Sequence, residues 1–286
     1  MFLSDAWRDF EVLDAGEGMK LERWGDYLLA RPDPQVIWPK AKPGLWGQAD
    51  AVYARSAAGG GAWTFKKPLP ERWEIAYRDL RFYVRPTGFK HTGLFPEQAG
   101  NWDWMRARVE GRPGARVLNL FAYTGGATLA LSMSGAKVTH VDAARGMVAW
   151  ARENRGLTGA PEDGCRYIVE DAKAFVRREL RRGSRYDGIL MDPPSYGRGP
   201  GGEVWKLEDE LFPLAELCAG LLSEEPLFFL INGYTTGFQP AVLGNILRRA
   251  LPEGALDAQE LCLPIASGGV LPAGATGRWR PKERTK

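Results

Sequence analysis

Two glycines and three aspartates in this chain stand at or just after the ends of apolar stretches of strand length. The run Asn119–Gly126 (NLFAYTGG) ends in two glycines, which permit a tight turn and a close approach of the backbone to a ligand. Asp142 and Asp171 stand at or just after the ends of the next two stretches. A carboxylate at the first position accepts hydrogen bonds from ribose hydroxyls, and one at the second accepts from an adenine amino group. These residues predict a site for an adenosine-containing cofactor.

A fourth feature is the run Asp192–Ser195 (DPPS), which follows the apolar stretch Tyr186–Asp192. Its prolines fix the backbone of the loop in which the reacting group must lie. Each of the four features alone is weak evidence, because an acid after a strand commonly caps the next helix. Their occurrence in order favours a ligand site.

Strands and helices must alternate to bring these features together, and from Arg116 they do. The expected strands are Arg116–Phe121, Lys137–Asp142, Arg166–Glu170, Tyr186–Asp192 and Leu227–Asn232, with Ala255–Pro264 and Ala275–Arg280 as an antiparallel edge pair. Helical stretches between strands imply a parallel sheet with right-handed crossovers, whose ligands bind beyond the carboxyl ends of the strands. Residues 101–286 are therefore predicted to form an α/β, doubly wound, mostly parallel seven-stranded sheet.

Residues 1–100 have a different sequence pattern. Short β-like runs, Tyr27–Ala30, Val36–Trp38, Ala62–Lys66 and Arg81–Val84, are separated by proline and glycine. This pattern predicts a small β-rich N-terminal domain with tight loops. We interpret its many tryptophans as core residues of that domain rather than as rings that stack on nucleic-acid bases.

A nicotinamide cofactor is the main rival for the adenosine site, because Asp142 would serve it equally well. Such a site requires G-x-G-x-x-G after the first strand. This chain has A-Y-T-G-G-A there, which lacks the first glycine. A nicotinamide enzyme also gives no reason for the DPPS run.

The runs NLFAYTGG and DPPS, with Asp142 and Asp171, resemble the class I S-adenosylmethionine-dependent methyltransferases, most closely the large-subunit ribosomal RNA methyltransferases. The run His91–Gln98 (HTGLFPEQ) resembles the lead-in to the cofactor site of that branch. The resemblance spans residues 85–280 and implies that Tyr123 to Gly125 flank the methionine part, Asp142 the ribose and Asp171 the adenine. The expected cofactor-binding residues are Phe95, Gln98, Asn119, Tyr123, Thr124, Gly125, Asp142, Ala143, Asp171, Ala172 and Asp192.

The chain also departs from that branch. We expect it to lack the separate RNA-binding N-terminal domain of the pseudouridine-synthase-associated type. It has no cysteine near residues 192–196 or 232–236, where members that methylate carbon carry a nucleophile. Carbon 5 of a pyrimidine is methylated only after a thiolate adds to the base, so a nitrogen acceptor is favoured.

A nitrogen acceptor needs mainly orientation. Asp192 and Pro193 are predicted to be catalytic, because a carboxylate and a carbonyl that accept hydrogen bonds from an amine aim its lone pair at the methyl group. The residues predicted to contact substrate are Pro194, Ser195, Tyr196 and His91. Tyr196 either stacks on an extruded base or packs at the sheet edge, and His91 either orients the acceptor or is structural.

Composition sets the remaining expectations. The net charge is +3 and neither half of the chain is polybasic, so charge alone does not require a nucleic-acid partner. No apolar run approaches the roughly 20 residues of a membrane helix, and the first residues do not form a secretion signal. The three separated cysteines have no metal-binding spacing and indicate a reducing compartment. We expect a cytoplasmic monomer or homodimer with no metal and no membrane partner.

The sequence therefore predicts an S-adenosylmethionine-dependent methyltransferase that acts on a ribosomal RNA base at nitrogen, without a covalent enzyme intermediate. Two alternatives stay open. One is a methyltransferase of a small molecule or protein. The other is a binding protein that holds the cofactor without turnover.

The lack of a suitably placed thiol generates a prediction. Single substitution of Cys165, Cys218 or Cys262 by Ala leaves the rate of methyl transfer nearly unchanged, because no thiolate adds to the acceptor. Single-turnover rates and melting temperatures of the three variants test this. A stable variant without activity, or a trapped protein–RNA adduct, contradicts it.

Overall fold

The computed structural model describes residues 1–56, 60–198, 204–235 and 237–282. The chain forms two compact units. We call the first the α/β unit; it contains residues 101–261 and 274–286, together with Met1. The second, the β unit, contains residues 2–100 and 262–273.

The α/β unit is built on a mixed sheet. Its strand order is β1-β16-β17-β15-β12-β9-β10-β11. The strands are β1 (Phe2–Leu3), β9 (Arg116–Leu120), β10 (Lys137–Asp142), β11 (Cys165–Val169), β12 (Gly188–Met191), β15 (Phe228–Gly233), β16 (Gly254–Pro264) and β17 (Val270–Pro281). The five strands β15, β12, β9, β10 and β11 are parallel neighbours, and β17 pairs with β15 in the antiparallel direction.

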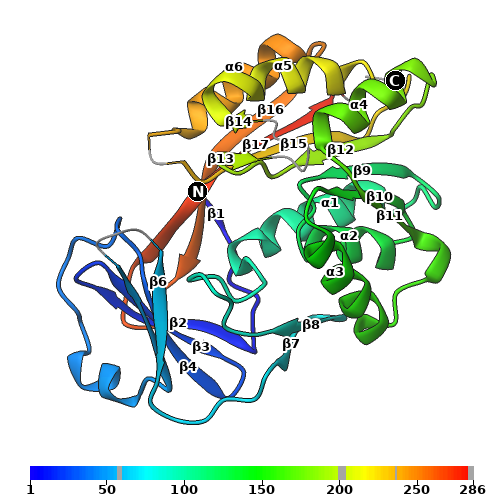
Figure 1. The fold of residues 1–286 in the computed structure, drawn as a ribbon. Coiled ribbons are helices and arrows are strands. Elements are labelled where there is room, and N and C mark those ends of the chain that lie inside the picture. The colour runs from blue at the N-terminus through cyan, green and yellow to red at the C-terminus, as the bar shows by residue number, and fades with distance from the viewer. Residues whose placement is uncertain (57–59, 199–203, 236, 283–286) are drawn as a thin grey trace. The chain divides into compact units, whose positions relative to one another are not determined.

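Helices cover both faces of this sheet (Figure 1). One face carries α1 (Ala99–Val109), α2 (Gly126–Met133) and α3 (Arg145–Thr158), and the other carries α4 (Ala172–Arg181), α5 (Leu207–Ala219) and α6 (Pro240–Ala250). The predicted α/β class is confirmed. The sheet has eight strands rather than the predicted seven, because β1 adds to its edge, although the two residues of this strand are counted with the β unit.

The central strands are apolar on both sides, as strands between two helix layers must be. Every residue of β12 and β15 is buried. Their core partners include Phe175 of α4 and Leu211 of α5. Gly188 in β12 has to be glycine, because a Cβ there would lie 2.6 Å from the ring of Phe228.

The β unit contains a five-stranded sheet with the order β2-β3-β4-β5-β6 and a separate hairpin, β7-β8. The strands are β2 (Phe10–Gly16), β3 (Met19–Trp24), β4 (Tyr27–Pro32), β5 (Ala51–Arg55), β6 (Gly61–Phe65), β7 (Trp73–Tyr77) and β8 (Leu80–Val84). The described residues also form three short 3₁₀ helices. Two lie in the β unit, η1 (Pro43–Gln48) and η2 (Pro96–Gln98), and η3 (Glu162–Gly164) lies in the α/β unit.

The predicted strand Val36–Trp38 is wrong. This segment has no strand partner, although the carbonyl groups of Val36 and Trp38 accept hydrogen bonds from Gly18 N and Glu17 N in the β2–β3 turn. Pro34 and Pro39 flank the segment and have no backbone N–H to donate to a ladder. The apolar run therefore packs as irregular chain.

A charged pair lies inside the β unit. The Arg31 guanidinium donates to the Glu22 carboxylate through Nε at 2.6 Å and through Nη2 at 2.9 Å, and Trp24 Nε1 donates to the same carboxylate at 3.2 Å. Glu22 is 0% and Arg31 6% exposed. Burial alone would raise the pKa of Glu22, but the charges of Arg31 and Lys20 and the hydrogen bonds hold that pKa below its usual value.

Breaking this pair should destabilise the β unit strongly. Glu22→Ala leaves the Arg31 charge buried without its counter-ion, which costs about 3–5 kcal/mol of unfolding free energy. The matched control is Glu17→Ala, which removes the partner of Lys40 in a more exposed pair 3.0 Å apart and should cost less than about 1 kcal/mol. Denaturant titration of both variants measures the difference. Equal losses would show that the buried pair contributes no more than the surface pair.

Candidate active site

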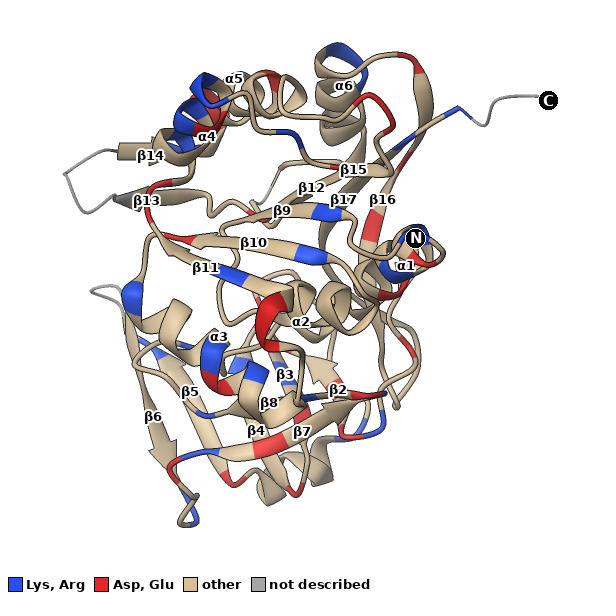
Figure 2. Cartoon of the chain, turned by 90° about the vertical axis from the view of Figure 1, so that its right-hand side faces the viewer, with Lys and Arg blue, Asp and Glu red and all other residues tan. Residues whose placement is uncertain are grey.

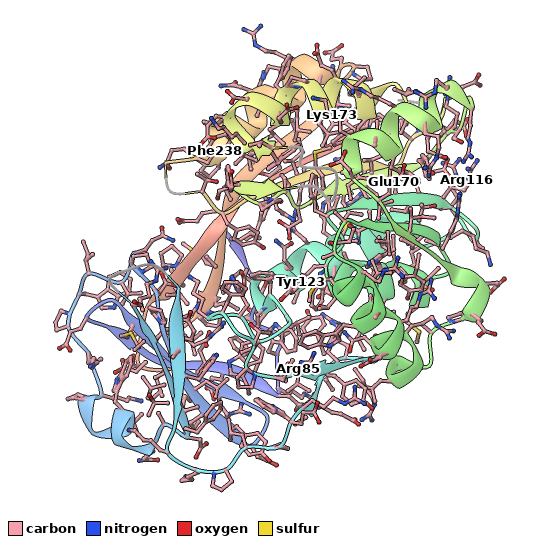
Figure 3. The ribbon with its side chains drawn as sticks, viewed as in Figure 1. Arg85, Arg116, Tyr123, Glu170, Lys173 and Phe238 are labelled. Carbon is pink, nitrogen blue, oxygen red and sulfur yellow. The ribbon has the colours of Figure 1, made fainter. Side chains whose placement is uncertain are left out.

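Four loops of the α/β unit meet at one edge of its sheet. β12, β9, β10 and β11 are parallel neighbours in that order, so their carboxyl ends lie together. Tyr123 follows β9, Asp142 ends β10, Asp171 follows β11 and Asp192 follows β12. Figure 3 labels Tyr123, and also Glu170, which directly follows β11. The topology thus brings together four of the predicted site residues from separate parts of the sequence.

The turn after β9 has an unusual backbone. Phe121, Tyr123 and Gly125 all have positive φ, at 56°, 51° and 91°. Residues other than glycine seldom adopt this conformation, and they do so most often at functional sites. Trp102 of α1 packs so closely on the turn that a Cβ at Gly126 would lie 2.6 Å from its ring. Glycine at position 126 therefore allows α2 to begin directly against α1.

Asp142 holds two loops at once. Its carboxylate accepts a hydrogen bond from Tyr123 N at 2.8 Å and another from Ala144 N at 2.8 Å. Burial raises the pKa of Asp142, and the two backbone hydrogen bonds oppose that rise. A carboxylate has about four acceptor sites, so both ribose hydroxyls can be bound while the loops stay fixed. Ala143, the next predicted cofactor residue, is exposed.

Asp171 is the N-cap of α4, where its side chain accepts from Ala174 N at 2.9 Å. The neighbouring Glu170 pairs with Arg178, and Ala172 is buried. An acid that follows a strand commonly caps the next helix, and Asp171 does so here. Contact of Asp171 with adenine stays a prediction.

Asn119 belongs to a buried polar chain beneath the turn. Its Nδ2 donates to Thr128 Oγ1 at 2.9 Å, and that hydroxyl lies 2.9 Å from His140 Nδ1. Burial, with a smaller effect of Arg152, lowers the pKa of His140 to about 3, so the ring is neutral. The His140 side chain therefore belongs to the buried polar chain, and the Asn119 side chain points to Thr128. Thr124 is buried too, and its carbonyl accepts from Asn154 Nδ2 at 3.0 Å.

The loop after β12 is held on several sides. Asp192 N donates to Leu120 O at 3.3 Å, and Leu207 N donates to Ser195 O at 3.1 Å. The hydroxyl of Thr235 lies 2.6 Å from that of Ser195. Pro193 is buried, whereas Pro194, Ser195 and Tyr196 are exposed. The loop therefore presents its substrate-side residues to solvent from a fixed backbone.

A short hairpin follows this loop, and sequence reasoning missed it. β13 (Tyr196–Arg198) pairs with β14 (Val204–Lys206). Trp205 in β14 donates its indole N–H to Pro194 O at 2.7 Å, and its ring lies 5.0 Å from that of Phe121. Trp205 thus contacts two segments. One is the loop Asp192–Ser195 after β12, which we call the acceptor loop because it is predicted to hold the acceptor, and the other is the turn 121–126 after β9, which we call the glycine turn. The signal in the sequence is the glycine-rich run between Tyr196 and Val204, which is typical of a hairpin.

Three predicted site residues belong to the β unit. Phe95 precedes η2 and is half-buried, and Gln98 ends η2 and is buried. The ring of His91 lies 5.4 Å from that of Phe95. Burial and the charges of Arg31, Lys90 and Lys20 lower the pKa of His91 to about 4, so it is neutral at physiological pH. Participation of these residues in the site stays a prediction.

The cysteines lie away from the acceptor loop in the fold. Cys165 begins β11, Cys218 lies in α5 and Cys262 in β16, and the last two are fully buried. Burial raises the pKa of Cys165 and of Cys218. Both thiols are therefore protonated at physiological pH and are poor nucleophiles.

Two kinds of feature are absent from the described part of the chain. No helix there is both long and apolar enough to cross a membrane. Among the same residues, no group of three or more histidines, cysteines and acids is arranged to hold a metal ion.

Comparison with known proteins identifies the family. The family described as S-adenosylmethionine-dependent methyltransferase matches residues 50–221. The chain belongs to this family. A solved S-adenosylmethionine-dependent methyltransferase from Agrobacterium tumefaciens is 38% identical, with a TM-score of 0.94, and covers 98% of this chain and 93% of its own. The glycine turn and Asp142 fit S-adenosylmethionine, because they supply a close backbone approach and a carboxylate acceptor.

Other relatives are more distant. The ribosomal RNA large subunit methyltransferase K/L of a Shewanella species is 35% identical over 41% of this chain, and that of Syntrophotalea carbinolica 30% over 57%. These matches span only 16% and 22% of those relatives. A methyltransferase solved with S-adenosylhomocysteine has a TM-score of 0.76 over 96% of this chain and 76% of its own, at 18% identity. That likeness shows the fold alone.

Asp142 yields the prediction for this site. Asp142→Ala should weaken S-adenosylhomocysteine binding by about 1–3 kcal/mol, because ribose hydroxyls and two loop amides lose their acceptor. Asp163→Ala is the control, since Asp163 is an exposed acid paired with Lys137, and it should bind as the unaltered protein does. Titration calorimetry measures both, with NAD as a ligand that should give no heat. Unchanged affinity in Asp142→Ala would remove this carboxylate from the cofactor site.

Proposed function

We propose that this methyltransferase acts on a nitrogen of a ribosomal RNA base. The fixed backbone of the DPPS loop carries this proposal. The exposed residues of this loop directly follow Asp192 and Pro193. The Asp192 carboxylate and the Pro193 carbonyl can accept hydrogen bonds from an acceptor amine. The names of the Shewanella and Syntrophotalea relatives support an RNA substrate.

In this proposal each group has a defined task. S-adenosylmethionine supplies an activated methyl group, so the protein mainly positions and desolvates. Asp142 holds the ribose, Asp171 the adenine, and Tyr123 to Gly125 flank the methionine part, with Phe95 and Gln98 beside it. Asp192 and Pro193 accept hydrogen bonds from the amine and aim its lone pair. Asp192 then takes the proton that the methylated nitrogen releases.

The substrate-side residues follow from the same loop. Tyr196 is 53% exposed, so its ring is available to stack on an extruded base. Pro194 and Ser195 border it, and His91 is the proposed contact from the β unit. No thiol takes part, because none of the three cysteines lies in the acceptor loop.

The test compares RNA from cells with and without the gene by nucleoside mass spectrometry. A single N-methylated nucleoside should disappear with the gene and return when purified protein and S-adenosylmethionine are added to the unmodified RNA. Methyl transfer to protein or small molecules instead would reject the RNA substrate. Cofactor binding without transfer to any fraction would reject turnover.

Asp192→Ala separates catalysis from stability. We expect turnover to fall roughly 100-fold or more if positioning dominates, while cofactor affinity changes much less than in Asp142→Ala. Turnover, cofactor affinity and melting temperature are measured on the same variant. A folded Asp192→Ala protein with near-normal turnover on its RNA would exclude Asp192 from the mechanism.

A further inference from the structure

Aromatic side chains line the edge strand of the β unit. Trp63 and Phe65 lie two residues apart on β6, so they share one face of the strand. Their ring centroids are 6.5 Å apart and their planes differ by 26°. Phe65 is 53% exposed and Trp63 is half-buried. The two rings therefore form a partly open, nearly parallel stack at the sheet edge.

The backbone of Phe89 is held next to Trp63. Trp63 Nε1 donates to Thr87 O at 2.9 Å and to Phe89 O at 3.0 Å. The Thr87 hydroxyl also accepts from Phe89 N at 3.3 Å. The Phe89 side chain is 67% exposed. We call Trp63, Phe65 and Phe89 the aromatic edge.

Packing accounts for Trp63, whose ring lies 5.4 Å from that of buried Tyr53, but not for Phe65 and Phe89. Trp24 and Trp73, in the same unit, are 0% and 9% exposed and contribute to its core. Phe65 and Phe89 instead keep more than half of their surface in water. Clustered exposed rings of this kind are typical of interaction sites.

Positive charge surrounds the aromatic edge. Arg55 ends β5 opposite Gly61 of β6, and Lys66 follows β6 directly. Both side chains are exposed, and neither forms an ion pair with a described residue. β5 and β6 carry no acidic colour in Figure 2. Exposed cations without acidic partners favour a negatively charged ligand.

Lys90 adds to this charge from the segment next to Phe89. Burial lowers the pKa of Lys90, and repulsion from Lys20, Arg31 and Arg55 lowers it further, against the attraction of Asp33. Lys20 and Arg31 are themselves paired with Glu22 and Asp33, whereas Lys90 and Arg55 are the charges of this group that lie nearest in sequence to the aromatic edge.

We propose that the aromatic edge, with Arg55, Lys66 and Lys90, binds a single-stranded segment of RNA. Bases stack on the rings, and the phosphates lie against the cations. Only unpaired bases expose their faces to aromatic side chains, which excludes duplex RNA from this surface. The inference rests on the proposed RNA substrate. It adds a second contact, at which the protein binds a part of the RNA that lies outside the acceptor loop.

Fluorescence anisotropy with a labelled oligouridylate, and with a duplex of equal length, tests the stacking. Phe65→Ala and Phe89→Ala should each weaken binding of the single strand about 5- to 100-fold, and the single strand should bind more tightly than the duplex. Ile37→Ala is the control, because Ile37 is 88% exposed and its segment contacts the β2–β3 turn rather than β6. Unchanged melting temperatures show that the variants are folded.

Salt dependence tests the phosphate contact. Lys66→Gln should reduce the slope of log affinity against log salt concentration by about 0.7. Lys42→Gln removes an exposed lysine from the same unit and should leave the slope unchanged.

The outcomes separate the two proposals. RNA binding and RNA methylation by the unaltered protein, with no loss in Phe65→Ala or Phe89→Ala, would overturn the surface and leave the proposed function standing. Absence of both binding and RNA methylation would overturn both proposals. A dimer that Phe65→Ala converts to monomer, with RNA affinity unchanged, would make the aromatic edge a contact between copies and also overturn the inference.

Discussion

The Asp142 carboxylate is the interaction that holds together the two loops of the predicted cofactor site. One of its oxygens holds the amide of Tyr123 and the other the amide of Ala144, each at 2.8 Å. The first bond fixes a turn whose residues occupy left-handed backbone conformations, and the second fixes the entry to α3. A single side chain therefore sets the separation of two loops that are predicted to contact different parts of the cofactor. Because burial disfavours its charge, the loop amides also help to keep the carboxylate ionised.

Trp205 contacts both the turn after β9 and the loop after β12. Its ring lies against Phe121 of the glycine turn, and its indole N–H holds the carbonyl of Pro194. Methyl transfer is an in-line displacement whose rate depends on the relative placement of donor and acceptor. A rigid ring that contacts both loops limits how far they can drift apart. The hydroxyl contact between Ser195 and Thr235 restrains the acceptor loop from the next strand.

The sequence predicted the parts of the fold that follow from periodicity and chain order. β10 has the predicted bounds, and β9, β11, β12 and β15 differ from theirs by one or two residues, because apolar runs closed by glycine or an acid leave little choice of strand end. Val36–Trp38 failed because apolar character alone does not supply a pairing partner beside two prolines. The hairpin of Trp205 was missed although the glycine-rich run before Val204 is a local signal for it, whereas the contact of Trp205 with Phe121 joins residues too distant in sequence to be predicted. The capping bond of Asp171 was foreseen as an alternative, but only coordinates could establish it.

The division of the chain has a consequence for its synthesis. Residues 262–273 belong to the β unit although most of the α/β unit precedes them. They are tied to its first strand, since Ser267 Oγ donates to Asp14 Oδ1 at 2.7 Å and Ala266 N donates to Val12 O at 2.8 Å. A ribosome that makes this chain releases the start of the β unit first and its last piece hundreds of residues later. The first strands of the β unit therefore lack their last packing partner until residues 101–261 have been translated. For the same reason, no single cut in the gene separates one unit from the other.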